Sequence, residues 1–176
     1  MKYYAVKKNR FDFKPNDQPL LTCKHRCLFG FILDESMWYR INDPSYPYGK
    51  YNGINKLGFG FTQGLFTNSK RTTTIGFFPS QETDYLTDVY LYINDKTGQW
   101  SATNILGVFP GQLCTGELSW QRYETIATLQ TGDKSASASF PLERSNFLPM
   151  RGIGAWFGGQ YPAFKDMAFQ AEFEYF

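Results

Sequence analysis

Cysteine and histidine side chains that could ligate a metal occur together in the run Cys23-Lys24-His25-Arg26-Cys27. The alternation of apolar residues continues from this run to Leu33, which predicts one extended strand. A strand rises roughly 3.3 Å per residue, so the Cα atoms of Cys23 and Cys27 should lie roughly 13 Å apart. A disulfide requires Cα atoms within roughly 7 Å, and one zinc ion draws its ligands comparably close. The run, like the separate Cys114, therefore predicts free thiols, and we expect no metal and no cofactor.

Groups for acid–base or nucleophilic catalysis are sparse. The one histidine, His25, is expected in a strand directed toward the core, which disfavours a Ser-His-Asp triad. Glu82, Asp84 and Asp88 cluster around one predicted turn, but this spacing does not show the fixed separation that glycoside hydrolysis requires. No glycine-rich phosphate loop leads into a helix pattern. We therefore predict that the protein has no catalytic residues and is not an enzyme.

A possible calcium loop lies at Asn94-Asp95-Lys96-Thr97-Gly98-Gln99. It lacks the oxygen at every second position and the later Glu of a calcium loop. Gly98 suits a left-handed turn position, so we predict a hairpin turn that leads to Trp100.

Aromatic side chains are the main candidates for ligand binding. The Pro- and Gly-rich segment 37–55 carries Trp38, Tyr46, Tyr48 and Tyr51. Tyr and Trp suit sugars, because a ring face stacks on C–H groups while the polar group hydrogen-bonds hydroxyls. The same rings could instead plug an edge of the fold, because exposed apolar patches on soluble domains are usually small. The sequence leaves both interpretations open.

Two further candidate binding residues lie on the strand predicted from Thr87 to Asn94. Strand residues alternate between faces, so Thr87 and Val89 face the core while Tyr90 and Tyr92 face the other side. Asp88 and Asn94 share the face of the two tyrosines. This face is predicted to be a polar aromatic strip.

Composition and periodicity predict an all-β protein. Aromatic residues make up 19% of the chain, and the 16 glycines suit tight turns. The segment from Met167 to Tyr175 alternates strictly, which places Phe169 and Phe173 on a buried face and Glu172 on the opposite one. We predict a single domain over residues 1–176 with eight to ten strands in two packed antiparallel sheets, of the jelly-roll or concanavalin-like class.

Several segments have predicted places in this fold. Leu21 to Asp34 is expected to be one central strand, and the basic first strand is expected near the acidic face of the last one. Ser135 to Phe140 alternates Ser with Ala, so it should be an edge strand. Gly58 and Gly60 alternate with Phe residues and leave room for close approach to the backbone.

The charge and hydropathy of the chain restrict its partners and its location. The formal net charge of +2 is too small to indicate nucleic acid. The apolar residues at the start are interrupted by charge, so we expect no signal peptide and no membrane insertion. The chain is therefore expected to be cytosolic when made. Together with the resemblance described next, this predicts the virion, or the host-cell cytoplasm before assembly, as its location.

Four stretches resemble a group of small jelly-roll proteins of gut Bacteroidota and their phages. They are INKLGFGF (54–61), NSKRTTTIGF (68–77), YLYINDKTG (90–98) and AWFGGQYPAFKDMAFQAEF (155–173). The group has a segment similar to YPYFGG-x-x-x-APHDM before its last strand. This chain carries Phe164-Lys165 where the group tends to have Pro-His, so any role of that histidine is lost here.

The resemblance implies a concanavalin-like or laminin-G-like sandwich that acts as a non-catalytic glycan-facing or virion-surface module. Such sandwiches include glycan-binding modules and some polysaccharide lyases and hydrolases. The main hypothesis is a phage structural, decoration or adhesion protein, and the alternatives are a carbohydrate-binding module and a lyase or hydrolase relative. The expected partners are a polysaccharide or other virion or surface proteins, and a homo-oligomer is a further possibility.

Overall fold

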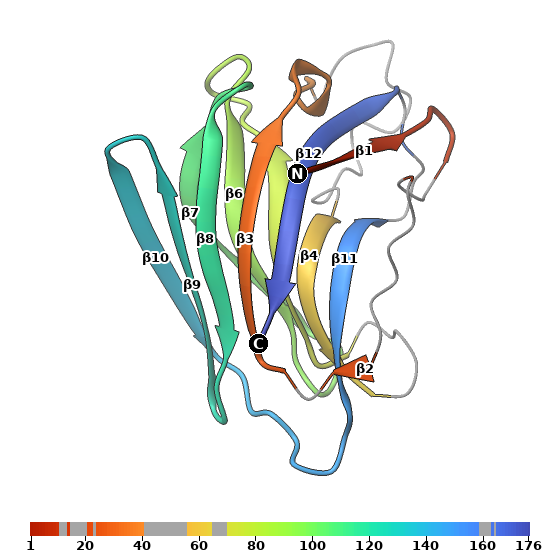
Figure 1. The fold of residues 1–176 in the computed structure, drawn as a ribbon, viewed down its shortest axis with the longest axis vertical. Helices are drawn as coiled ribbons and strands as arrows, with labels where there is room; N and C mark the ends of the chain where they lie inside the picture. The colour runs from red at the N-terminus through yellow and green to blue at the C-terminus, as the bar shows by residue number, and fades with distance from the viewer. Residues whose placement is uncertain are drawn as a thin grey trace.

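Extended strands account for most of the described chain. The computed structural model of the protein describes residues 1–10, 14, 21–22, 24–40, 56–64, 70–158, 163 and 165–176. The front sheet in Figure 1 has the strand order β1 (Lys2–Val6), β12 (Met167–Tyr175), β3 (Arg26–Leu33), β8 (Leu113–Trp120), β9 (Glu124–Thr131), β10 (Lys134–Pro141). The back sheet has the order β2 (Leu21–Thr22), β11 (Met150–Gly158), β4 (Lys56–Gln63), β5 (Thr72–Pro79), β6 (Thr87–Asn94), β7 (Trp100–Val108). The predicted two-sheet antiparallel sandwich is confirmed.

Helix is confined to one short turn in the described part of the chain. This turn is the 3-10 helix η1 (Glu35–Met37), which Asp34 caps through its side chain. Within the same described residues there is no helix of the length and apolarity needed to cross a membrane.

Aromatic rings fill the space between the two sheets. Phe59 of the back sheet lies 4.8 Å from Phe29 and 4.6 Å from Phe173 of the front sheet, measured between ring centroids. Phe31 meets Phe77 edge to face at 4.9 Å. Such pairs each contribute about 0.5–1.5 kcal/mol beyond the burial of their area. The alternation of Phe residues along β3, β4 and β12 is therefore what holds the sheets together.

The glycines of β4 permit the close approach that the sequence predicts, and the neighbour is strand β5. A Cβ atom on Gly58 would stand 2.7 Å from the carbonyl oxygen of Ile75. One on Gly60 would stand 2.2 Å from the carbonyl oxygen of Thr73. Both distances are too short for a side chain, so glycine is required at these two positions.

The first and last strands pair with each other, as predicted from their charges. Lys2 lies opposite Ala171 in the antiparallel ladder between β1 and β12. The Lys7 ammonium lies 2.6 Å from the Asp166 carboxylate, and the amino group of Met1 lies 3.3 Å from Glu172. β10 lies at the edge of the front sheet, which confirms the prediction for the Ser-Ala segment.

The prediction of one strand from Leu21 to Asp34 is wrong. Residues 21–22 pair with β11 in the back sheet, whereas β3 pairs with β12 and β8 in the front sheet. The chain has joined the front sheet by His25, since the backbone N–H groups of His25 and Arg26 both donate to the carbonyl of Phe176, which follows β12. His25 is consequently exposed and is not directed toward the core.

The thiols of Cys27 and Cys114 are free and buried. Burial raises the pKa of each to about 12. Cys23 lies outside the described residues.

Candidate functional site

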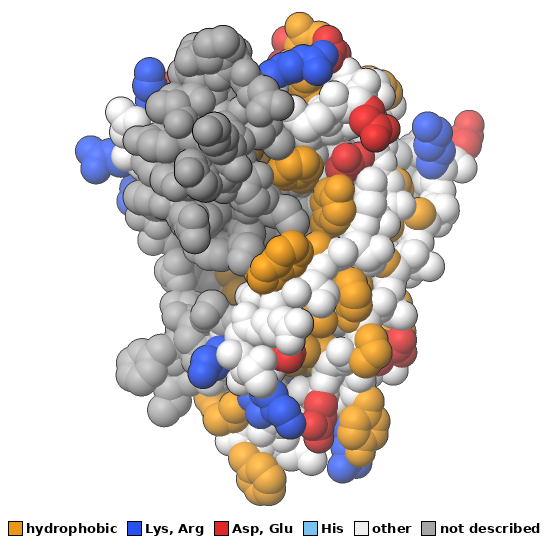
Figure 2. Space-filling model, turned by 180° about the vertical axis from the view of Figure 1, so that it is seen from behind, with side chains coloured by type: hydrophobic (Ala, Val, Ile, Leu, Met, Phe, Trp, Pro, Cys, Tyr) orange, Lys and Arg blue, Asp and Glu red, His pale blue; other side chains and the backbone are white. Residues whose placement is uncertain are grey.

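Strand β6 presents polar and aromatic side chains on the outer face of the back sheet. Val89 and Leu91 are fully buried in the core, so Asp88, Tyr90 and Asn94 point to the opposite face. This outer face is the one seen in Figure 2, where a broken diagonal band of hydrophobic side chains crosses a mostly uncharged surface.

The strands on either side of β6 complete this surface. The ladder places Asn94 opposite Trp100, Tyr90 opposite Asn104, and Asp88 opposite Phe78. Residues that face each other in a ladder share one face of the sheet. The outer strip, as we name this surface, consists of Phe78, Asp88, Tyr90, Tyr92, Asn94, Trp100 and Asn104.

One end of the outer strip is an exposed indole on a buried support. Trp100 is 59% exposed and stacks on Tyr92, with ring centroids 6.3 Å apart and planes 14° apart. Tyr92 is only 2% exposed, and its hydroxyl donates a 2.8 Å hydrogen bond to Asn94 Oδ1. Burial raises the pKa of Tyr92 to about 12. Trp100 therefore offers a ring to a ligand, while Tyr92 and Asn94 fix the position of that ring.

The middle of the outer strip combines a half-buried phenol with a carboxyl group. The ring of Tyr90 meets Phe78 edge to face at 6.4 Å. Burial, followed by the charge of Asp88, raises the pKa of Tyr90. Burial also raises the pKa of Asp88, an effect that a hydrogen bond from Asn104 opposes and the charge of Glu82 reinforces. Asp88 therefore keeps its proton to a higher pH than an ordinary aspartate.

Trp38 lies beyond the Asp88 end of the outer strip. Its Nε1 donates a 3.0 Å hydrogen bond to the carbonyl oxygen of Ser80, in the connection between β5 and β6. Tyr85 lies 5.1 Å from Trp38 between ring centroids, and the Arg40 guanidinium lies over the Trp38 ring at 5.5 Å. Arg40 also pairs with Asp84. The polar group of Trp38 is thus engaged within the protein.

The structure brings together two of the six aromatic residues proposed from the sequence as ligand-binding. Tyr90 and Tyr92 share the outer strip, and Trp38 lies at its end. Tyr46, Tyr48 and Tyr51 lie outside the described residues.

Sequence reasoning missed Trp100 and Asn104. The hairpin that follows β6 carries the signal for Trp100. Asp95 closes this turn, because its Oδ1 accepts hydrogen bonds from the backbone of Thr97 and Gln99. A hairpin closed in this way places Trp100 opposite Asn94, and so beside the tyrosines.

The outer strip suits a long ligand better than a compact one. The part of β6 from Asp88 to Asn94 spans roughly 20 Å at roughly 3.3 Å per residue. The accessible groups along this length include two rings, Tyr90 and Trp100, and two polar side chains, Asp88 and Asn104. The described residues contain no group of three or more His, Cys, Asp or Glu able to hold a metal ion.

Comparisons with known proteins place the fold but give no family. No protein-family model and no curated protein sequence matches the chain. An alginate lyase from Klebsiella pneumoniae is similar in structure with a TM-score of 0.60 and 8% identity, over 86% of this chain and 60% of the lyase. For an alginate lyase from Alteromonas sp. 272, the TM-score is 0.48 and the identity is 11%, over 99% of this chain and 79% of the lyase. For a toad ovary galectin in complex with thio-digalactose, the TM-score is 0.37 and the identity is 13%, over 98% of this chain and 99% of the galectin.

The likeness to the Klebsiella lyase confirms the jelly-roll, concanavalin-like sandwich. The chain spans about 60% of the length of that lyase. The prediction that the protein is not an enzyme is contradicted, because the Klebsiella structure that shares this fold is an enzyme, an alginate lyase. At 8% identity the likeness shows the fold alone, so a function has to be argued from the site.

Proposed function

We propose that the protein binds a polysaccharide along the outer strip. The observation that carries the proposal is the exposed ring of Trp100, in line with the half-exposed Tyr90 and the hydrogen-bonding pair Asp88 and Asn104. A sugar chain offers C–H faces to rings and hydroxyls to polar groups at regular intervals. The similarity to a sandwich named as an alginate lyase supports a polysaccharide as the class of ligand without identifying the sugar.

The contacts beneath Trp100 lower the entropic cost of binding a ligand there. Tyr92 stacks beneath the indole and Asn94 anchors Tyr92, so the ring loses little freedom when a ligand arrives. Truncation of such an anchor typically costs more than 1 kcal/mol of binding free energy.

Affinity electrophoresis of the intact chain in gels that contain neutral or acidic polysaccharides tests the proposal. We expect one polysaccharide class to retard the wild type, and Trp100→Ala and Tyr90→Ala to weaken binding about tenfold, which is about 1.4 kcal/mol. Tyr123→Ala is the matched control, since Tyr123 is also exposed but lies outside the outer strip. Equal retardation of all three variants would refute the proposal.

Hydrolysis of the bound chain is the second candidate function, and Asp88 favours it. Asp88 is held by Asn104 and has a raised pKa, so it can act as a general acid that protonates the leaving oxygen of a glycosidic bond, while a water molecule attacks the anomeric carbon and releases its proton to solvent. New reducing ends would show cleavage. Asp88→Asn should abolish product while polysaccharide binding persists, and product formation by that variant would exclude this role.

The place of action is proposed from the sequence resemblance alone. A polysaccharide-binding sandwich could act on a virion or at a bacterial surface. Mass spectrometry of purified particles and of bacterial surface fractions distinguishes the two locations, and absence of the chain from particles would exclude the virion.

A further inference from the structure

A pocket on the front sheet lies on the opposite side of the sandwich from the outer strip. Its volume is about 360 Å³, and its nine described lining residues include Tyr3, Ile32, Asp34, Glu35, Gly111 and Gln170. The ladders place Tyr3 opposite Gln170 and Gln170 opposite Ile32, so these three side chains form one row across β1, β12 and β3. The row lies on the outer face of the front sheet.

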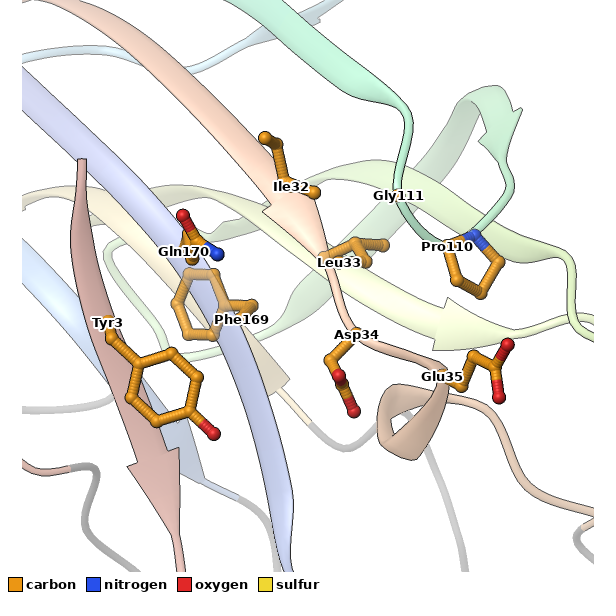
Figure 3. A pocket seen from close by; sticks show the side chains of 9 residues that line it. All are labelled: Tyr3, Ile32, Leu33, Asp34, Glu35, Pro110, Gly111, Phe169 and Gln170. Carbon is orange, nitrogen blue, oxygen red and sulfur yellow. The ribbon is translucent and has the colours of Figure 1, made fainter.

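An exposed aromatic ring stands beside this pocket. Tyr3 is 60% exposed although its backbone is fixed in a ladder. Figure 3 shows its hydroxyl on the side of Asp34, with Gln170 above the ring. The backbone that carries the ring is therefore fixed, and the exposed ring can stack on a ligand.

The polar groups of the pocket are mostly hydrogen-bond acceptors. Asp34 Oδ1 accepts a 2.9 Å hydrogen bond from the backbone N–H of Ser36, and this interaction with Ser36 lowers the pKa of Asp34. Glu35 adds a second carboxylate, and Gln170 adds an amide. None of the nine described lining residues is Lys, Arg or His, and the charge of Lys165, which lies outside the lining, also lowers the pKa of Asp34. A uronate or sulfated ligand would meet two carboxylates in the lining against this one cation outside it, which disfavours its binding relative to a neutral sugar.

The backbone around the pocket is pre-formed. The N–H of Gly111 donates a 2.9 Å hydrogen bond to the carbonyl of Leu33, which ties the β7–β8 turn to the end of β3. The N–H of Asp34 donates to the carbonyl of Ala168 at 3.3 Å. Little of the lining has to be ordered when a ligand enters, which lowers the entropic cost of binding.

We propose that this pocket is a second saccharide site, which takes an uncharged sugar residue with its C–H face on Tyr3 and its hydroxyls on Glu35, Asp34 and Gln170. Its volume lies near the lower end of the range for small-molecule sites, about 300–1,000 Å³, so it suits one or two sugar rings rather than a long chain. Together with the outer strip it gives one chain two sugar-binding surfaces on opposite sheets. The pocket and the outer strip share no residues, so the proposal for the pocket does not depend on the function proposed for the outer strip.

Equilibrium binding of fluorescently labelled neutral oligosaccharides (gluco-, xylo-, manno- and galacto-series) to the intact chain tests the pocket. Alginate and polygalacturonate oligomers are the anionic comparison, and arginine amide is the cationic one. We expect a neutral series to bind, and Tyr3→Ala and Glu35→Ala each to weaken that binding at least about tenfold at this site. Tyr123→Ala is the matched control, because Tyr123 is also 60% exposed and lies away from the pocket.

The outcomes separate the pocket from the outer strip. Two bound sugars per chain, one lost in Tyr3→Ala and the other in Trp100→Ala, support both sites. One bound neutral sugar that is lost only in Tyr3→Ala supports the pocket, and it refutes the outer strip if the anionic oligomers do not bind either. If folded Tyr3→Ala and Glu35→Ala variants bind the neutral oligosaccharides as tightly as the wild type does, the proposal for the pocket is refuted. Tighter binding of the anionic oligomers than of the neutral ones at the pocket also refutes it. Binding of arginine amide without any sugar would also overturn it, since the occupant would then be a basic group.

Discussion

The hydroxyl groups of Thr73 and Thr125 lie 2.8 Å apart and join the two sheets across the core. Both side chains are fully buried, and Thr125 also donates to the carbonyl of Ser119 at 3.2 Å. Among the described contacts, the Thr73 hydroxyl makes no second hydrogen bond. The two members of the pair should therefore respond differently to removal of the hydroxyl.

We predict that Thr125→Val costs more stability than Thr73→Val. Thr125→Val leaves the Thr73 hydroxyl buried without a partner, at a cost of about 1–3 kcal/mol, whereas after Thr73→Val the Thr125 hydroxyl still has Ser119. The double variant should be less destabilised than the sum of the two single variants. Urea unfolding measures all three, and equal single costs with strict additivity would contradict the pairing.

Alanine substitutions along the last strand, β12, should lower the stability of the protein to different degrees. Phe169 is 1% exposed and packs on Tyr4 at 5.4 Å, so Phe169→Ala should cost about 3–5 kcal/mol. Phe173 is half-buried, so we expect a smaller loss for Phe173→Ala. Glu174→Ala, on the exposed face, should stay within about 0.5 kcal/mol. Thermal unfolding that ranks Glu174→Ala as the most destabilised variant would mean that the faces of β12 are reversed.

The faces of β6 and β12 were predictable because strict alternation assigns each side chain to one of two sides. The sheet to which a strand belongs could not be predicted in this way. The incorrect prediction of one continuous strand from Leu21 to Asp34 is an example. Sheet membership depends on pairing with distant segments such as β11 and β12, and alternation does not report it. Likewise, alternation placed Tyr92 on the outer face but could not show that this ring would be buried beneath its neighbours.

The second saccharide site could not be predicted for a related reason. Tyr3, Asp34, Gly111 and Gln170 come from four separate parts of the chain. No local spacing marks them as neighbours. Only the strand order β1-β12-β3-β8 brings them together.

Stability should fall in alkaline solution because buried thiol and phenol groups, Tyr175 among them, hold their protons tightly. The pKa values of Cys27 and Cys114 are raised from 9.0 to about 12, and that of Tyr92 from 10.0 to about 12. The folded state thus binds these protons more tightly than the unfolded state. Their contribution is complete below pH 9 and is lost as the pH rises toward 12. Urea unfolding at a series of pH values measures this decline, which should be shallower in a Cys27→Ala, Cys114→Ala double variant.

Substitution of Trp38 should lower mainly the stability of the protein, whereas substitution of Trp100 should lower mainly its binding to polysaccharide. Trp38 bridges η1 to the β5–β6 connection through Ser80, Tyr85 and Arg40, so Trp38→Ala should cost roughly 2–4 kcal/mol. Trp100 is 59% exposed, so Trp100→Ala should lower the melting temperature little while it weakens polysaccharide binding. Thermal unfolding beside affinity electrophoresis of both variants makes the comparison. If Trp38→Ala keeps full stability but loses binding, the ring of Trp38 belongs to the ligand surface, and the structural role that its contacts indicate is wrong.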